Sequence, residues 1–114
     1  QVVANRVVGE VGGRTCIVVD DMIDTGGTIA SATRAVLDAG AKQVIVAAAH
    51  GVLSDPAAER LSNCGLTEVV LTNTLPIPQN HRFPKLTVLS IAPILARAIH
   101  EVFEDGSVTS LFES

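Results

Sequence analysis

The sequence contains no tryptophan and no tyrosine, and phenylalanine occurs only three times in 114 residues. Because aromatic side chains are so scarce, a core has to be built from Val, Ile, Leu and Ala, which are abundant. Basic residues are also in the minority, with eight Lys and Arg against twelve Asp and Glu, for a formal net charge of −4. That balance argues against a nucleic-acid surface, which would be basic. The length predicts a single domain, at residues 1–114.

Long apolar runs and paired cysteines are missing as well. No apolar stretch reaches the roughly 20 residues of a membrane-spanning helix, and the first residues do not resemble a secretory signal. The two cysteines, Cys16 and Cys64, are too few for a disulfide framework, and neither has a second Cys or His at ligand spacing. These features predict a cytoplasmic protein with free thiols, no membrane partner and no cysteine-bound metal.

The most informative stretch joins an apolar run to a glycine loop and a helix. The run 16–19 is rich in β-branched residues and predicts a buried strand that ends at two carboxylates, Asp20 and Asp21. Residues 29–37 have a helical pattern. Between the carboxylates and the helix stands a third aspartate followed by two threonines and two glycines, Asp24-Thr25-Gly26-Gly27-Thr28. The predicted order is therefore strand, acidic corner, glycine loop and helix.

This order predicts a site for a sugar phosphate. Adjacent glycines allow positive φ angles and close approach of a ligand, and the N–H groups of residues 25–28 lack intrahelical partners at a helix start. The helix dipole and the Thr25 and Thr28 hydroxyls favour a phosphate dianion there. The carboxylates of Asp20 and Asp21 would repel the phosphate but accept hydrogen bonds from a diol, or bind a metal. A ligand with a phosphate at one end and a diol about one sugar ring away would suit both sites, and ribose 5-phosphate is such a ligand.

A simpler interpretation of the same stretch is a helix N-cap preceded by a tight turn. Three clustered aspartates favour the ligand site, because like charges are costly to bring together unless a ligand uses them.

The rest of the chain alternates strands with helices. Strands are predicted at 42–49, 67–72 and 86–89, and helices at 28–38, 57–62 and 90–103. Val2–Val8 is expected to be extended, ahead of a turn at Gly12-Gly13. The alternation predicts an α/β fold with a mostly parallel sheet and flanking helices, whose ligands lie at the carboxyl ends of the strands.

Several single residues are assigned from this outline. His50 follows the second strand and is therefore expected beside the aspartates, with either a structural role or a contact to substrate. Ser54 or Asp55 is expected to cap the second helix, with Pro56 at its first position. Ser90 is expected to cap the last helix, whose apolar stripe predicts either core or a subunit interface.

The stretch Val18-Val19-Asp20-Asp21-Met22-Ile23-Asp24-Thr25-Gly26-Gly27-Thr28 resembles the signature shared by type I phosphoribosyltransferases and ribose-phosphate pyrophosphokinases. Four further stretches, in matching order, resemble the C-terminal half of a bacterial pyrophosphokinase: Ala49–Ala57, Thr72–Pro78, Leu89–Pro93 and Asp105–Phe112. The resemblance runs along the whole chain. It implies a type I phosphoribosyltransferase-like, Rossmann-like domain, the ribose-5-phosphate-binding half of a two-domain enzyme. Since the family's ATP-binding half and catalytic loop precede this part, and Gln1 stands in place of Met, the chain is expected to be a fragment.

The activity that the resemblance implies is transfer of the β,γ-pyrophosphoryl group of ATP to ribose 5-phosphate, with Mg²⁺. The product, 5-phosphoribosyl 1-pyrophosphate, serves nucleotide biosynthesis. Residues 25–28 would hold the 5-phosphate, with Asp24 at the loop entrance. Asp20 and Asp21 would accept hydrogen bonds from the 2- and 3-hydroxyls and could reach the metal through the substrate. Neither a catalytic residue nor a direct metal ligand is expected in this chain, which is predicted to be inactive alone.

The resemblance also implies assembly and regulation. The family forms dimers that assemble into hexamers, and hydroxyls of the tail help to form a regulatory site for phosphate or ADP between subunits. Ser107 and Thr109 occupy the matching positions, although the family commonly has Ser where Thr109 stands.

Two alternative functions remain open. One is a type I phosphoribosyltransferase, which would need a nucleobase hood that the sequence does not reveal. The other is a non-catalytic regulatory subunit of a synthetase, which the intact aspartates and glycines argue against.

Overall fold

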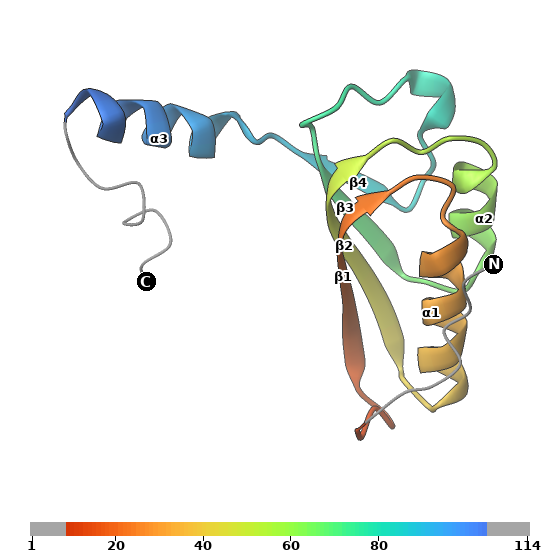
Figure 1. Ribbon diagram of the computed structural model, residues 1–114. Helices are drawn as coiled ribbons and strands as arrows, with labels where there is room; N and C mark the ends of the chain where they lie inside the picture. The colour runs from red at the N-terminus through yellow and green to blue at the C-terminus, as the bar shows by residue number, and fades with distance from the viewer. Residues whose placement is uncertain (1–8, 105–114) are drawn as a thin grey trace.

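The computed structural model of the chain describes residues 9–104. Its four strands form a parallel sheet in the order β1-β2-β3-β4 (Figure 1). The strands are β1 (Thr15–Ile23), β2 (Gln43–Gly51), β3 (Glu68–Thr72) and β4 (Leu86–Leu89). The helices are α1 (Gly27–Asp38), α2 (Ala57–Asn63) and α3 (Ala92–Phe103), with a 3₁₀ turn, η1, at Gln79–His81. The predicted α/β class and parallel sheet are confirmed.

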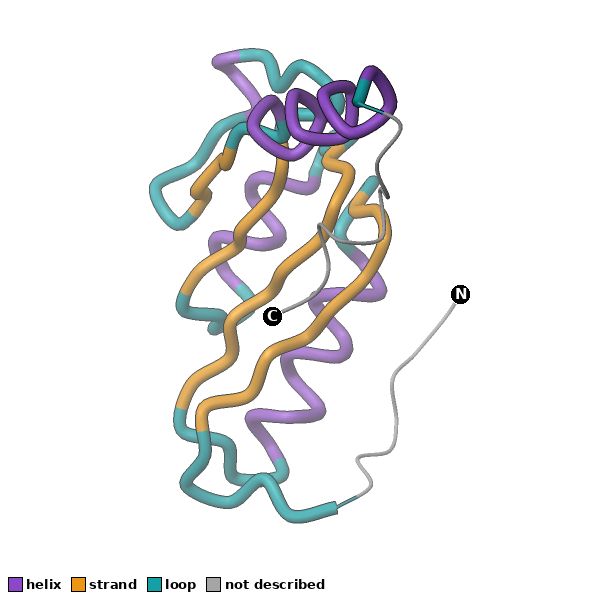
Figure 2. The backbone as a smooth tube through the Cα atoms, turned by 90° about the vertical axis from the view of Figure 1, so that its left-hand side faces the viewer, coloured by secondary structure: helices purple, strands orange, loops and turns teal. Residues whose placement is uncertain are grey.

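Helices α1 and α2 lie on the same face of the sheet, as Figures 1 and 2 show from two directions. Each connects two neighbouring parallel strands, and crossovers of one hand that advance in one direction place successive helices on one face. The core lies between the sheet and these helices. Its fully buried members include Val46 and Leu71 from the strands and Leu61 from α2. The aliphatic core expected from the composition is confirmed.

Strand β1 differs from the expected buried strand in two respects. It continues through Asp20 and Asp21 to Ile23 rather than ending before the first carboxylate. Its Ile17 and Val19 are 63% and 75% exposed, because they point away from the face that α1 and α2 cover. Residues along β1 therefore alternate between exposed and half-buried, and a run of β-branched residues does not reveal which side faces the helices.

The start of α2 also differs from the prediction. The N-cap is Pro56, and neither Ser54 nor Asp55 caps the helix with its side chain. Proline thus stands one position earlier than expected. The residues that were predicted to cap α2 lie in the turn that leads from β2 into it.

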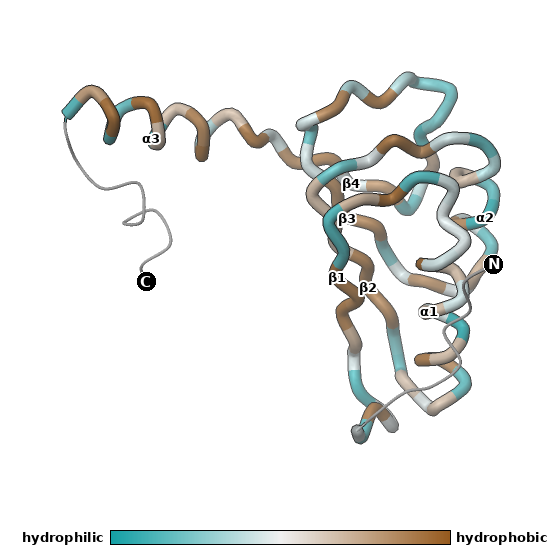
Figure 3. Tube along the Cα trace, viewed as in Figure 1, coloured by the Kyte–Doolittle hydropathy of each residue, from teal (hydrophilic) through white to brown (hydrophobic). Residues whose placement is uncertain are grey.

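Helix α3 extends away from the carboxyl end of the sheet (Figure 1), and none of its residues is buried. The N-cap of α3 is Ile91 and not the expected Ser90, which stands one position earlier and accepts a hydrogen bond from the Ala92 N–H at 3.1 Å. Hydrophobic residues recur along α3 in Figure 3, and five of them are 48–84% exposed: Ile94, Leu95, Ile99, Val102 and Phe103. The stripe is therefore not part of the core of residues 9–104, and its role as a subunit interface stays a prediction.

Some sequence-based predictions fall beyond the described residues. The expected extended segment Val2–Val8 and the tail hydroxyls of Ser107 and Thr109 are among them. Within residues 9–104, no helix is both long and apolar enough to cross a bilayer.

One buried hydroxyl offers a test of the core. Thr33 on α1 is 0% exposed, and its Oγ1 has no hydrogen-bond partner among the described residues. Because an unpaired buried hydroxyl is costly, Thr33→Val should raise the free energy of unfolding by about 1 kcal/mol in urea denaturation. Thr87→Val is the matched control, since the Thr87 hydroxyl donates to the Glu68 carboxylate and its loss should destabilise the chain. Equal effects of both changes would contradict this account.

Candidate functional site

A hollow of about 210 Å³ lies where β1 leads into α1. Its lining includes the buried residues Ile23, Gly26 and Ile29, the half-buried Asp20, and the exposed polar residues Asp24, Thr25 and Thr28. The nine lining residues are Asp20, Met22, Ile23, Asp24, Thr25, Gly26, Gly27, Thr28 and Ile29. The structure thus gathers every predicted binding residue except Asp21, which is absent from this lining.

The loop between β1 and α1 presents unpaired backbone donors. The N-cap of α1 is Gly26, at φ 81° and ψ 2°, and no side chain caps the helix. Among residues 9–104, the N–H groups of residues 25–29 donate no hydrogen bond, and the first bond of the helix runs from the Ala30 N–H to the Gly26 carbonyl at 2.8 Å. An aspartate or threonine N-cap, the simpler interpretation of the sequence, is therefore not what forms. Five consecutive N–H groups at a helix start can bind an anion.

Packing against α2 fixes the conformation of this loop. A Cβ on Gly26 would lie 3.2 Å from Cγ of Leu61, which is itself 0% exposed. Position 26 therefore requires glycine for two reasons, namely the positive φ and the closeness of a core side chain. Core packing thus holds the unpaired N–H groups of the loop in place.

The two adjacent aspartates are neighbours at the end of β1. Asp20 pairs in register with Ala48, a buried residue of the helix-covered face, and its Oδ1 accepts a hydrogen bond from the Asp21 N–H at 2.7 Å. Hydrogen bonding, first with the Asp21 side chain and then with the Asp21 backbone N–H, holds the pKa of Asp20 below its ordinary value, although desolvation opposes the shift. Asp20 is consequently ionised at neutral pH and can only accept hydrogen bonds.

Residues 3–113 match the family model described as "Phosphoribosyl synthetase-associated domain". The chain belongs to this family. It is 66% identical over 113 residues to the ribose-phosphate pyrophosphokinase of Mycobacterium tuberculosis strain H37Rv, covering 99% of this chain and 35% of that protein. For the Bifidobacterium longum pyrophosphokinase, the identity is 65% over 114 residues, covering 100% of this chain and 34% of the relative.

A solved structure agrees with the synthetase-associated domain in fold. The crystal structure of phosphoribosylpyrophosphate synthetase from Mycobacterium smegmatis superposes with a TM-score of 0.85 at 65% identity. The superposition covers 90% of this chain and 35% of that one. The chain therefore spans about a third of the length of the relatives it matches, and the predicted resemblance to bacterial pyrophosphokinases is confirmed.

In this synthetase-associated domain, α2 supplies a cation that the sequence analysis missed. Nη1 of Arg60 donates to the Thr25 carbonyl oxygen at 3.1 Å, across 35 positions of the chain. One indirect signal of it is present in the sequence. The helix that carries Arg60 was predicted to begin just after the carboxyl end of the second strand, the edge where ligands bind in parallel sheets.

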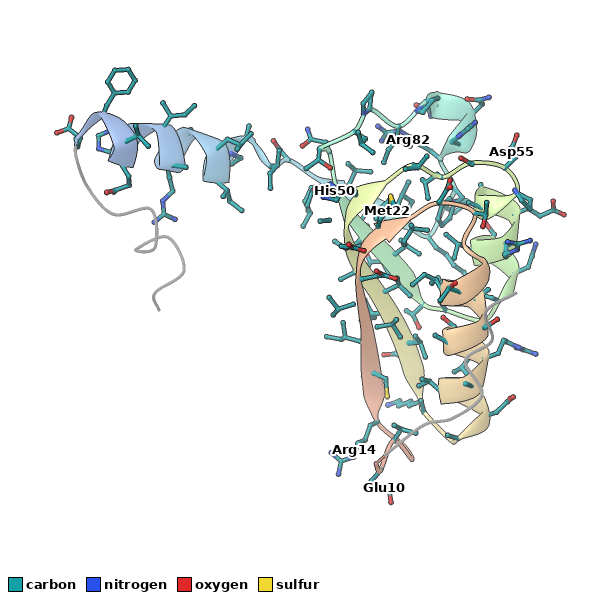
Figure 4. All side chains as sticks on the ribbon, in the orientation of Figure 1. Glu10, Arg14, Met22, His50, Asp55 and Arg82 are labelled. Atoms are coloured by element: carbon teal, nitrogen blue, oxygen red, sulfur yellow. The ribbon has the colours of Figure 1, made fainter. Side chains whose placement is uncertain are left out.

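The expected position of His50 at the carboxyl end of the sheet is confirmed. It pairs in register with Met22, and Figure 4 shows both near the end of the sheet opposite Glu10 and Arg14. Nδ1 of His50 lies 2.7 Å from Oγ1 of Thr74, which follows β3. His50 does not line the hollow, so this arrangement favours the structural role over the substrate contact.

Proposed function

We propose that this synthetase-associated domain binds ribose 5-phosphate in the hollow between β1 and α1, as the sugar-phosphate site of a ribose-phosphate pyrophosphokinase. The observation that carries the proposal is the row of N–H groups at residues 25–29, which have no partner among the described residues. A phosphate dianion would complete their hydrogen bonding and meet the positive end of the α1 dipole. The relatives named above are pyrophosphokinases, which favours this function over the phosphoribosyltransferase alternative.

Each polar residue of the corner has a role in this proposal. The backbone of residues 25–28 and the Thr25 and Thr28 hydroxyls hold the 5-phosphate, and Asp24 stands at the entrance of the loop. The carboxylates of Asp20 and Asp21 accept hydrogen bonds from the 2- and 3-hydroxyls. The role of Asp20 is supported by its position in the lining of the hollow. The role of Asp21 is supported by its hydrogen bonding with Asp20, which places the two carboxylates side by side.

A Mg²⁺ ion fits this corner only through the substrate. Among residues 9–104, no three His, Cys, Asp or Glu side chains are grouped so that they could hold a metal by themselves. Mg²⁺ commonly keeps several of its waters and binds substrate oxygens, so the ion would reach Asp20 and Asp21 through the hydroxyls of the bound substrate. When bound, the ion would neutralise charge on the pyrophosphoryl group during transfer.

The whole reaction requires more than this chain. We propose that the ATP site and the catalytic loop belong to the part of the pyrophosphokinase that lies outside the matched third of its length. The complete enzyme would act in the cytoplasm, produce 5-phosphoribosyl 1-pyrophosphate for nucleotide biosynthesis, and assemble from dimers into hexamers. Phosphate or ADP would regulate it through a site that includes Ser107 and Thr109.

Titration of the 114-residue chain with ribose 5-phosphate tests the proposal. Weak binding is expected, with a Kd of about 0.1–1 mM, because an exposed loop and a few hydrogen bonds supply most of the free energy. Amide chemical shifts of residues 25–29 should move with ribose 5-phosphate, and move far less with ribose at equal concentration. The chain mixed with ATP, Mg²⁺ and ribose 5-phosphate should form no 5-phosphoribosyl 1-pyrophosphate. Unperturbed amides of residues 25–29 at saturating ribose 5-phosphate would refute the proposed binding site. Product formation by the chain alone would refute the expectation that it is inactive.

A further inference from the structure

We propose that Arg60 is a positioning residue for phosphate binding, which orients a loop N–H toward the ligand and places positive charge behind the loop. The inference rests on the proposed binding of ribose 5-phosphate to residues 25–28. Arg60 would not touch the phosphate itself. It acts through the peptide group that joins Thr25 to Gly26.

The hydrogen bond of Arg60 determines where that peptide group points. Nη1 of Arg60 donates to the Thr25 carbonyl oxygen at 3.1 Å. The Thr25–Gly26 bond is trans, since the only cis peptide bond among the described residues is Asp55-Pro56. In a planar trans peptide the carbonyl oxygen and the following N–H point in opposite directions. Anchoring the Thr25 carbonyl on Arg60 therefore directs the Gly26 N–H away from Arg60.

The two sides of the loop are distinct. Gly26 and Thr25 line the hollow at the end of β1, and Arg60 does not. Arg60 instead lines a separate surface groove of about 460 Å³ between α1 and α2, together with Arg34, Glu59 and Cys64. The guanidinium thus lies behind the loop, on the side away from the hollow, and the Gly26 N–H turns to the hollow side.

The second glycine of the loop supports the same conclusion. Gly26 has a positive φ, but Gly27 is not among the residues with positive φ, so its backbone conformation does not require glycine. A Cβ on Gly27 would lie 3.1 Å from Nη1 of Arg60. The missing side chain at position 27 therefore makes room for the guanidinium. Two consecutive residues of α2 thus lie against the two glycines of the loop, Leu61 against Gly26 and Arg60 against Gly27.

The charge of Arg60 is also available to the site. No ion pair within 4.0 Å engages Arg60 in the part of the chain that the structure describes, although Glu59 lines the same groove. The positive charge of the guanidinium adds to that of the α1 dipole. Because Arg60 is exposed, salt should screen this contribution, which makes it measurable.

Replacement of Arg60 in the 114-residue chain provides the test. Arg60→Met keeps most of the aliphatic stem and removes the charge and the donor. We expect it to weaken ribose 5-phosphate binding about tenfold, the scale of one exposed charge-assisted hydrogen bond. Arg60→Lys, which retains a charge and a donor, should recover part of the loss. The matched control is Arg34→Met, in the same groove but with no hydrogen bond to the loop among described residues, and its Kd should match wild type.

Two further measurements separate positioning from mere support of the fold. The dependence of log Kd on log salt concentration should be shallower in Arg60→Met than in wild type and unchanged in Arg34→Met. Gly27→Ala, which displaces the guanidinium, should weaken binding about fivefold in the wild-type chain and have almost no effect in the Arg60→Met background.

The outcomes are distinguishable from failure of the proposed function. If the wild-type chain does not bind ribose 5-phosphate, the proposed function fails. If the wild-type chain binds and folded Arg60→Met retains the wild-type Kd and salt slope, the role of Arg60 is overturned. Additive effects of Gly27→Ala and Arg60→Met would also overturn it, because the two changes act on one contact.

Discussion

Gly26→Ala is expected to weaken binding of ribose 5-phosphate by about 100-fold or more, the largest effect of any single methyl group added to this chain. An alanine at φ 81° is strained, and its Cβ would lie 3.2 Å from Cγ of Leu61. Leu61 is 0% exposed and cannot retreat without opening the core. The loop must therefore move, and the N–H groups of residues 25–29 would no longer converge on one phosphate. Calorimetric titration of the folded variant measures the loss.

Gly13→Ala is the matched control for this prediction. Gly13 has φ 70°, close to that of Gly26, but a Cβ there would meet no atom of residues 9–104 within 4 Å. It lies in the turn before β1, at the opposite end of the strand from the loop. Both variants should lose stability from backbone strain, about 1 kcal/mol for Gly13→Ala and more for Gly26→Ala. Only Gly26→Ala should change the Kd, and a wild-type Kd in that variant would rule out the preorganised loop.

The local features of the site could be predicted because each has a local cause. The apolar run, the glycine pair and the helical pattern of α1 lie within 24 consecutive residues, Thr15 to Asp38, and these set the order strand, loop and helix. Their periods of two and 3.6 residues are properties of short segments. The sequence thus located the hollow and six of its nine lining residues, namely Asp20, Asp24, Thr25, Gly26, Gly27 and Thr28.

The features that were missed depend on residues distant in sequence. Arg60 reaches Thr25 across 35 positions, and no periodicity within α2 indicates which residue will meet the loop. The exposure of Ile17 and Val19 depends on which face the crossovers cover, and the same β-branched residues suit either face. The stripe of α3 was recognised as amphipathic, but amphipathicity does not identify what packs against it.

For Gly27, the sequence predicts the correct motif but not the reason for the glycine. From the sequence, conformational freedom and close approach of a ligand explain both glycines. The structure gives a positive φ to Gly26 alone and places Nη1 of Arg60 3.1 Å from the missing Cβ of Gly27. The backbone therefore requires glycine at position 26, whereas glycine at position 27 leaves room for the Arg60 guanidinium.

The second large effect expected is at the acidic corner, where neighbouring carboxylates should not contribute equally. Asp20 lines the hollow and Asp21 does not. Asp20→Asn keeps an oxygen that can accept from the Asp21 N–H, so the fold should persist while the charge is lost. We expect ribose 5-phosphate binding to weaken about 30-fold in Asp20→Asn, within the range for hydrogen bonds to charged groups, and about threefold in Asp21→Asn.

A ligand that lacks a hydroxyl turns this comparison into a thermodynamic cycle. If Asp20 accepts from the diol, the loss caused by Asp20→Asn should be smaller for 2-deoxyribose 5-phosphate than for ribose 5-phosphate, because part of the interaction is already missing. If Asp20→Asn instead weakened binding only through an effect on the phosphate, the loss of affinity would be equal for both ligands. The pKa of Asp20 is held below its ordinary value, so the wild-type carboxylate is ionised throughout a titration at neutral pH. Equal losses of affinity for both ligands, or a larger loss in Asp21→Asn than in Asp20→Asn, would show that Asp20 does not accept a hydrogen bond from the sugar hydroxyls.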